Sequence, residues 1–313
     1  MKPLRLGTRR SLMATTQSQL VADVFSQHTG YAVELVGVTT QGDVSKAHLA
    51  QIGGTGVFVN GIRERLLTGE IDFAVHSLKD LPTAAPDGIE LAAVPARDDP
   101  RDALCGPVKL ADLPAGARVG TGSPRRVAQL RAIRSDLDVV PIRGNADTRL
   151  RKVAEGEVAA VLLAYAGLAR IDRLDAVAEV LDPNLMLPAP GQGALAVECR
   201  ADRADLVELL GTLDDPATRA AVTAERALLA ALEAGCSAPV GAYAAPAVAP
   251  ATPAVGDEIS DLRLTAAVVS ADGAHQVRLS ASGDPARAAE LGRDLAARLL
   301  ADGAAELMGE HIP

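Results

Sequence analysis

The chain has 313 residues, more than one compact core usually holds, so we expect two or three domains. Its 31 Lys and Arg against 40 Asp and Glu give a net charge of -9, which argues against a nucleic-acid partner held by phosphate contacts. Aromatic residues make up 2% with no Trp, so nucleic-acid bases would also find no stacking platform. An acidic chain can still bind anions where its Arg side chains converge on one site.

The N-terminal sequence and the cysteine pattern indicate the cellular compartment in which the protein works. Residues 1–10 carry charges with no apolar run behind them, so we predict no signal peptide. No stretch of about 18 apolar residues occurs, so we expect no membrane partner. Cys105, Cys199 and Cys236 are odd in number and far apart, which favours neither a disulfide framework nor a zinc site. The five His residues are also scattered, so we expect no metal and a reducing cytosol.

Short β-rich runs alternate with helical patterns over the first two thirds of the chain, which is typical of α/β units. In chain order the first predicted elements are a strand over 4–8, a helix over 11–28, a strand over 32–39, a helix over 57–67, a strand over 71–76 and a loop over 77–82. The helix over 11–28 has its expected apolar side at Leu12, Leu20, Val21, Val24 and Phe25.

Two later segments repeat patterns of the first part. Residues 117–121 echo residues 4–8, because in both a short strand runs into Gly-Thr and then into polar or basic residues. Residues 155–161 echo residues 68–74 in a similar way. Chance likeness between ordinary α/β units is one interpretation. The other is a pair of related domains facing each other across a cleft, a common place for a ligand.

The composition changes after Glu198. Residues 216–234 predict a long Ala-rich helix stopped by Gly235, and residues 244–256 an Ala- and Pro-rich loop. Strands over 262–269 and 276–281 and a final helix over 286–300 follow. We therefore predict two α/β domains around a cleft and a small α+β C-terminal domain. The expected boundaries are 1–97 with 195–214 for domain 1, 98–194 for domain 2 and 215–313 for domain 3.

Residues 120–126 join a predicted strand to a predicted helix and favour a bound anion. Ser123 is a good N-cap and Pro124 suits the first helical position. The exposed N–H groups and the helix dipole at such a joint attract negative charge. Arg125 and Arg126 at that joint can grip carboxylates in a bidentate manner.

Other Arg residues stand at similar joints. Arg143 and Arg149 flank the next strand-to-helix joint, Arg170 follows the strand over 158–164, and Arg9 follows the first strand. Each of them alone is more often a solvated surface Arg. Together, at equivalent strand ends, they predict a cleft for a polyanion.

Asp80 and Cys236 are the candidate reacting groups. Asp80 follows a very apolar strand, where catalytic groups in open α/β sheets tend to lie, and its carboxylate could stabilise a developing cation or transfer a proton. A turn Asp before Pro82 is the alternative. Cys236 comes just after a predicted helix end, where the dipole disfavours thiolate, so it fits an attachment point used once better than a turnover nucleophile.

Six blocks of sequence, taken in order, give the chain a family resemblance from end to end: residues 8–11, 76–82, 120–126, 143–149, 190–193 and 232–241. The chain resembles the porphobilinogen deaminases, also called hydroxymethylbilane synthases. The resemblance implies three domains, the first two similar to type II periplasmic binding proteins, in an enzyme that is usually monomeric. It also implies a dipyrromethane cofactor, one per chain, held by a thioether to Cys236.

The reaction implied by the resemblance adds four porphobilinogen molecules head to tail, with loss of ammonia from each, and releases a linear tetrapyrrole. A downstream uroporphyrinogen synthase would receive the product. Asp80 would assist deamination. Residues that would hold cofactor and substrate are Arg9, Ser11, Ser77, Lys79, Arg97, Thr121, Gly122, Ser123, Arg125, Arg126, Arg143, Gly144, Arg149, Arg170 and Gln192.

The resemblance also implies a mobile glycine-rich loop, here at Gly53, Gly54, Thr55, Gly56 and Phe58. The loop departs from the family pattern, since Thr55 and Asn60 are neutral at positions that are often basic. Gly122 likewise replaces a common Ser. Two rival functions are a non-catalytic two-domain anion-binding protein and a transcriptional effector domain. The first would leave Cys236 without a purpose, and the second lacks a basic helix-turn-helix before the α/β region.

Overall fold

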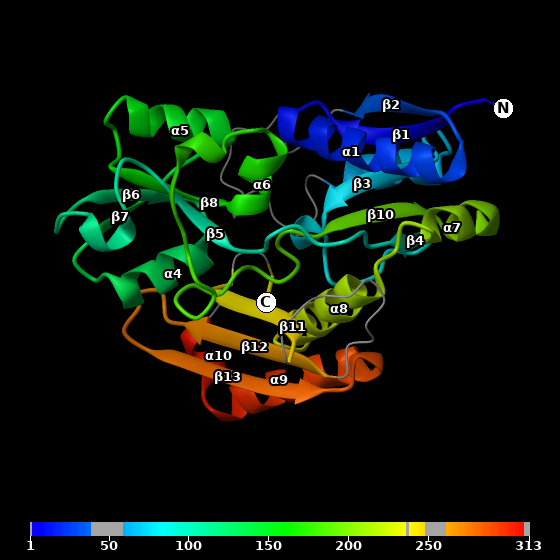
Figure 1. The fold of residues 1–313 in the computed structure, drawn as a ribbon. Coiled ribbons are helices and arrows are strands. Elements are labelled where there is room, and N and C mark those ends of the chain that lie inside the picture. The colour runs from blue at the N-terminus through cyan, green and yellow to red at the C-terminus, as the bar shows by residue number, and fades with distance from the viewer. Residues whose placement is uncertain (1, 39–58, 236–237, 248–260, 310–313) are drawn as a thin grey trace. The chain divides into compact units, whose positions relative to one another are not determined.

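The computed structural model describes residues 2–38, 59–235, 238–247 and 261–309, which form three sheets with helices against them (Figure 1). The chain divides into two compact units. Unit 1 comprises Met1–Asp98 with Gly193–Arg219, and unit 2 comprises Asp99–Gln192 with Ala220–Pro313. Unit 2 therefore contains two of the three sheets, and the division into three domains stays a prediction.

A five-stranded sheet in the order β2-β1-β3-β10-β4 forms the centre of unit 1. Its strands are β1 (Leu4–Arg9), β2 (Val33–Val38), β3 (Phe73–Ser77), β4 (Ile89–Ala93) and β10 (Leu195–Arg200). The helices are α1 (Leu12–Thr29), α3 (Asn60–Leu67) and α7 (Ala204–Gly211). β1 runs parallel to β2 and β3, whereas β10 runs antiparallel to β3 and β4. Leu6, Phe25 and Phe73 are fully buried in one core cluster between α1 and the sheet.

Unit 2 contains a second five-stranded sheet, in the order β7-β6-β8-β5-β9. Its strands are β5 (Asp102–Cys105), β6 (Arg118–Thr121), β7 (Asp138–Pro141), β8 (Ala160–Ala164) and β9 (Val177–Val180). The accompanying helices are α4 (Pro124–Ile133), α5 (Ala146–Ala154) and α6 (Tyr165–Arg170). β6 runs parallel to β7 and β8, and β5 runs antiparallel to β8 and β9.

The two five-stranded sheets have the same topology. In the first sheet β1 lies between β2 and β3, and the antiparallel β10 separates β3 from β4. In the second sheet β6 lies between β7 and β8, and the antiparallel β5 separates β8 from β9. β1 and β6 correspond, as do β3 and β8, and these are the strands whose sequences echo each other. The prediction of two related α/β units is confirmed.

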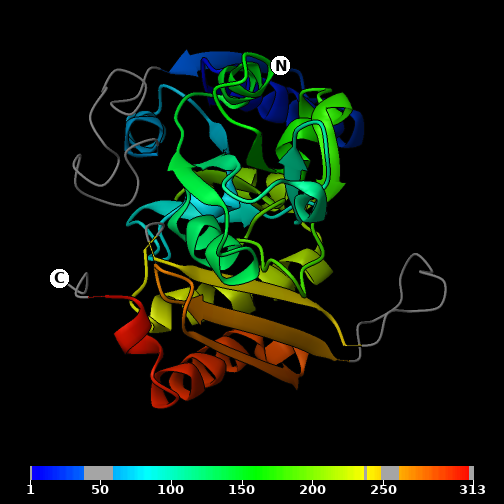
Figure 2. The same ribbon diagram turned by 90° about the vertical axis from the view of Figure 1, so that its left-hand side faces the viewer.

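The third sheet is antiparallel and contains β11 (Val240–Pro246), β12 (Leu262–Val269) and β13 (Gln276–Gly283). The helices beside it are α8 (Pro216–Ala231), α9 (Ala288–Ala301) and α10 (Ala304–Leu307). Figure 2 shows α9 running along one face of this sheet, where Leu264 and Leu295 belong to one fully buried cluster. On the other face Ala267 packs against Ala128 of α4, so the second and third sheets share a small apolar contact.

Three details of the predicted elements are wrong. Val21 and Phe25 of α1 are buried as predicted, but Leu12, Leu20 and Val24 are 57%, 46% and 44% exposed. Gln17, Ser18 and Ala22 complete the buried face in their place. Residues 244–246, predicted as loop, belong to β11, whose pairing with β12 outweighs its Ala-rich composition. α8 ends at Ala231, before Gly235, and Glu233 adopts the left-handed conformation after it. Among the described residues, no helix is both long and apolar enough to cross a bilayer.

Candidate functional site

The predicted site residues of unit 1 gather at one edge of its sheet. Arg9 is the last residue of β1 and Ser77 the last of β3, and because these strands are parallel their carboxyl ends meet at the same edge. The predicted loop after β3 is a single 3-10 turn over Leu78–Asp80. Leu78 is fully buried and its N–H donates to Ala194 O at 3.0 Å, so the turn is anchored while Asp80 is exposed. Lys79, between them, is half-buried.

The start of α1 adds two polar side chains beside this edge. Ser11 is the N-cap residue, and its side chain accepts a hydrogen bond from Ala14 N at 3.4 Å. Gln17 is 5% exposed, and its Oε1 accepts a hydrogen bond from Ser77 Oγ at 3.2 Å. Gln17 was missed in the sequence, although its spacing of four residues from Val21 places it on the buried face of the helix.

A buried ionic cluster lies deeper in the same sheet and was also missed. Glu198 of β10 accepts hydrogen bonds from Arg63 Nε at 3.0 Å and from Arg63 Nη2 at 2.6 Å. His76 Nε2 lies 3.4 Å from Glu198 Oε2, within ion-pair distance but outside hydrogen-bond geometry. Burial raises the pKa of Glu198, but His76 and Arg63 outweigh it and lower this pKa to about 2. The cluster ties α3 and β10 to the strand that leads to Asp80.

Arg97, the remaining predicted residue of unit 1, lies between β4 and the end of the unit's first segment. Its backbone N–H donates to Thr218 Oγ1 at 3.0 Å, and its side chain is half-buried. Thr218 is itself held in the first turn of α8 by Asp215, whose carboxylate accepts from Thr218 N at 2.7 Å.

In unit 2 the predicted anion site lies where β6 passes into α4. Thr121 is the last residue of β6 and is 1% exposed, and its Oγ1 accepts a hydrogen bond from Ser123 N at 3.3 Å. Ser123 occupies the N-cap position and Pro124 begins the helix, as predicted. Within the described part of the chain, the Ser123 side chain makes no capping hydrogen bond. The first N–H groups of α4 are therefore left to bind another acceptor.

Arg125 and Arg126 are buried, and both bind a carboxylate of the chain itself, that of Asp102. Arg125 Nη1 donates to Asp102 Oδ2 at 2.7 Å and to Leu187 O at 2.6 Å. Arg126 donates to Asp102 Oδ1 through Nε at 3.1 Å and Nη2 at 2.7 Å, and its Nη1 donates to Leu162 O at 3.0 Å. Arg125 Nε is buried and has no acceptor among the described residues. Asp102 was not identified in the sequence.

Electrostatics in this cluster favour a further anion. Burial raises the pKa of Asp102, but Arg125 and Arg126 outweigh it, and the pKa falls well below its usual range. Burial, followed by the charge of Arg126, lowers the pKa of Arg149, so these two cations lie close enough to repel. Two guanidinium groups share one carboxylate here, and a buried excess of positive charge is costly unless an anion is bound.

The other predicted residues of unit 2 lie at or beyond the same strand ends. Arg143 is exposed just after β7, and Arg149 Nε on α5 donates to Gly144 O at 2.9 Å. Gly144 has a φ of 104°, and a Cβ there would lie 2.6 Å from Thr148 Cγ2, so the turn requires glycine. Arg170 is the last residue of α6 and so is removed from the end of β8 by the whole helix.

Gln192 is 1% exposed and donates from Nε2 to Pro100 O at 2.7 Å and to Asp102 Oδ1 at 2.8 Å. It thus joins the cluster around Asp102. Cys236 and the glycine-rich loop residues Gly53, Gly54, Thr55, Gly56 and Phe58 lie outside the described residues.

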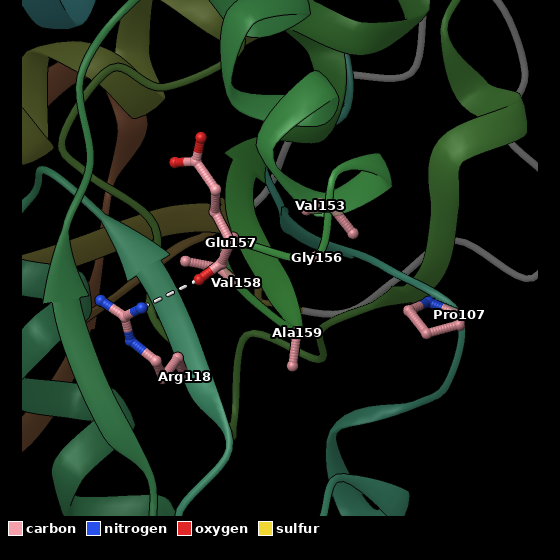
Figure 3. A pocket seen from close by; sticks show the side chains of 7 residues that line it. All are labelled: Pro107, Arg118, Val153, Gly156, Glu157, Val158 and Ala159. Carbon is pink, nitrogen blue, oxygen red and sulfur yellow. Dashed lines mark hydrogen bonds between the residues drawn. The ribbon is translucent and has the colours of Figure 1, made fainter.

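The described surface also has a hollow of about 420 Å³, lined by Pro107, Arg118, Val153, Gly156, Glu157, Val158 and Ala159 (Figure 3). Arg118 Nη1 donates to the backbone oxygen of Glu157 at 3.1 Å. Arg118 is the first residue of β6, whereas Thr121 is the last. The hollow therefore lies at the opposite end of the strand from the anion site, and it contains none of the predicted residues.

The residues at the anion site suit a polycarboxylate group. The buried Arg125 Nε lacks an acceptor among the described residues, and the uncapped start of α4 offers N–H donors. The described residues contain no group of three His, Cys, Asp or Glu side chains that could hold a metal ion.

Two family models match the chain in order. Residues 4–208 match "Porphobilinogen deaminase, dipyromethane cofactor binding domain", and residues 219–301 match "Porphobilinogen deaminase, C-terminal domain". Porphobilinogen deaminase 1 of Streptomyces coelicolor is 57% identical, with 99% of this chain and 98% of that protein covered. Porphobilinogen deaminase of Thermobifida fusca is 57% identical, with 98% of this chain and 96% of that protein covered. Porphobilinogen deaminase of Mycobacterium tuberculosis is 52% identical, with 97% of this chain and 98% of that protein covered. A periplasmic substrate-binding protein of an ABC transporter from Coxiella burnetii has a TM-score of 0.43 at 14% identity, over 69% of this chain and 94% of that one.

Proposed function

Because the chain belongs to the porphobilinogen deaminase family, we propose that it joins four porphobilinogen molecules head to tail to give the linear tetrapyrrole hydroxymethylbilane. One ammonia is lost for each molecule joined, which makes the enzyme a transferase of tetrapyrrole synthesis. The observation that carries the proposal is the ordered match of both family models, with relatives of that name at 52–58% identity over nearly the whole chain. A cytosolic location is supported by Cys105 and Cys199, which are buried and unpaired.

The anion site of unit 2 would hold the dipyrromethane cofactor through its carboxylates, and Cys236 would attach it as a thioether. When bound, this cofactor supplies the pyrrole carbon to which the first substrate is joined. Arg125 Nε, the first N–H groups of α4 and the half-buried Arg149 are the donors that support this assignment. Charge-assisted hydrogen bonds of this kind contribute about 1.5–3 kcal/mol each.

Asp80 is the group we propose to act on the reacting ring. It is exposed at the carboxyl edge of the unit 1 sheet, in a turn held by the buried Leu78. A carboxylate held in that way can stabilise a cationic pyrrole or move a proton without first reorganising the backbone. Arg9, Ser77 and Lys79 share this edge and would bind the substrate carboxylates or orient Asp80.

The test of Asp80 is the Asp80→Asn variant. Removing one positioned acid–base or charge-stabilising group lowers turnover by about 10²–10⁴-fold, and we expect a loss in that range in ammonia release from porphobilinogen. The far-UV circular dichroism and Tm should not change, because the side chain is exposed. Asp87→Asn is the matched control, since Asp87 is also exposed and lies in the following loop. Near-normal turnover in Asp80→Asn would remove Asp80 from the mechanism.

The same assay separates the enzyme from a non-catalytic anion-binding protein. Wild-type protein that binds porphobilinogen without releasing ammonia would favour the binding protein. The family match predicts release.

A further inference from the structure

We propose that Asp102 is a positioning residue, which holds the Arg125 and Arg126 guanidinium groups in the orientation that receives a carboxylate of the cofactor. This inference rests on the function proposed above. Asp102 is fully buried, and its sequence context alone predicts no role for it.

The place of Asp102 in the sheet puts it at the ligand end. It is the first residue of β5, and the antiparallel register pairs it with Ala164, the last residue of β8. β8 runs parallel to β6, so Asp102 lies at the edge where β6 ends in Thr121 and α4 begins. A carboxylate at this edge meets the side chains of the first turn of α4 directly.

The hydrogen bonds fix both guanidinium groups in different ways. Arg126 uses Nε and Nη2 on one oxygen of Asp102 and Nη1 on Leu162 O, so all three of its nitrogens are engaged. Arg125 uses Nη1 on the other oxygen and on Leu187 O, while its Nε has no acceptor among the described residues. Asp102 therefore holds Arg125 in place with one buried donor unused, and that donor can bind an incoming carboxylate.

A third donor ties Asp102 to the rest of unit 2. Gln192 Nε2 donates to Asp102 Oδ1 at 2.8 Å. The preceding residue, Gly191, donates its N–H to Glu225 Oε2 at 2.6 Å, and Glu225 Oε1 accepts from Ala244 N of β11 at 2.9 Å. Asp102 is thus connected by buried hydrogen bonds to β11, the strand that begins shortly after Cys236 in the chain. Through Asp102, the network fixes the positions of Arg125 and Arg126 relative to the third sheet, whose first strand follows Cys236 in the sequence.

If Asp102 served only to balance charge, its variants would behave differently from those of a positioning residue. If Asp102 only neutralised the two arginines, Asp102→Glu would preserve the function, because the charge is kept. A positioning role predicts a defect in both Asp102→Asn and Asp102→Glu, since the longer side chain displaces both guanidinium groups. Misplacing a binding group by about 1 Å can cost about 10²-fold in rate.

The experiment measures loading of the full-length apoprotein, prepared without substrate and then incubated with porphobilinogen. Intact mass gives the rate at which the covalent increment appears, and Tm is measured on the same samples. Leu295→Ala is the matched control, because it opens a cavity in the core beside the third sheet and lowers the Tm without touching the arginines.

We expect the Asp102 variants to load at least about tenfold more slowly than wild type, and Leu295→Ala to load at the wild-type rate despite its lower Tm. If Asp102→Asn does not fold, Asp102→Glu decides. Wild-type loading in Asp102→Glu, or equal slowing in Leu295→Ala, would overturn the inference. A wild-type protein that gains no mass would instead overturn the proposed function.

Discussion

Lowering the pH should destabilise the fold of unit 1 through the protonation of Glu198. The pKa of this carboxyl falls from the ordinary 4.5 to about 2 in the folded chain, because His76 and Arg63 outweigh the effect of burial. A group whose folded pKa is lowered stabilises the fold fully above its unfolded pKa, and this contribution is lost as the pH falls towards the folded pKa. Each pKa unit is about 1.4 kcal/mol, so the whole contribution is about 3 kcal/mol, of which about 2 kcal/mol is lost between about pH 7 and about pH 3.

The perturbation is Glu198→Gln, which removes the charge and leaves the buried Arg63 without a carboxylate. At neutral pH the variant should have an unfolding free energy about 3 kcal/mol below that of wild type. At about pH 3 the difference should shrink to about 1 kcal/mol, because wild type has by then lost most of the contribution.

Urea unfolding followed by far-UV circular dichroism measures these differences, since the chain has no Trp for fluorescence. Glu70→Gln is the control: Glu70 forms an exposed ion pair with Arg65, so its removal should cost no more than about 1 kcal/mol. A difference between wild type and Glu198→Gln that stays constant from neutral to acid pH would refute the reasoning.

Two further predictions concern packing and thiol chemistry. A Cβ at Gly292 of α9 would lie 2.3 Å from Ala224 O of α8, so Gly292→Ala should lower the unfolding free energy by about 1–3 kcal/mol. At the half-buried Gly303, a Cβ would meet no atom within 4 Å, but φ is 91°. Gly303→Ala should therefore cost only about 1 kcal/mol, through backbone strain. Burial raises the pKa of both Cys105 and Cys199 to about 11. Iodoacetamide at mildly alkaline pH should therefore leave both thiols unmodified in the native protein and modify them in urea; rapid labelling without urea would contradict their burial.

The strand ends were predictable because Gly-Thr followed by polar residues marks them locally. Thr121, Ser123 and Pro124 take the positions expected of them, and β1 and β6 correspond as their sequences suggest. β11 was partly missed because Ala-rich sequence carries little strand preference, and pairing with β12 decides its structure.

The ionic clusters could not be predicted from local patterns. Asp102 meets Arg125 and Arg126 only because β5 enters the second sheet beside β8, and Glu198 meets Arg63 across 135 residues of chain. The buried face of α1 was only partly predicted, for a similar reason. Val21 and Phe25 are buried as predicted, but Gln17 and Ser18 are buried while the more apolar Leu20 and Val24 stay exposed. Hydrophobic periodicity alone does not predict that exchange.

The central claim is that the chain carries a covalent oligopyrrole on Cys236 and extends it. Intact mass spectrometry of the natively purified protein, before and after addition of porphobilinogen, tests this most directly. The account predicts a fixed increment over the polypeptide mass, further discrete increments after substrate, and neither in Cys236→Ala. A wild-type mass equal to that of the bare polypeptide, unchanged by porphobilinogen, would contradict it.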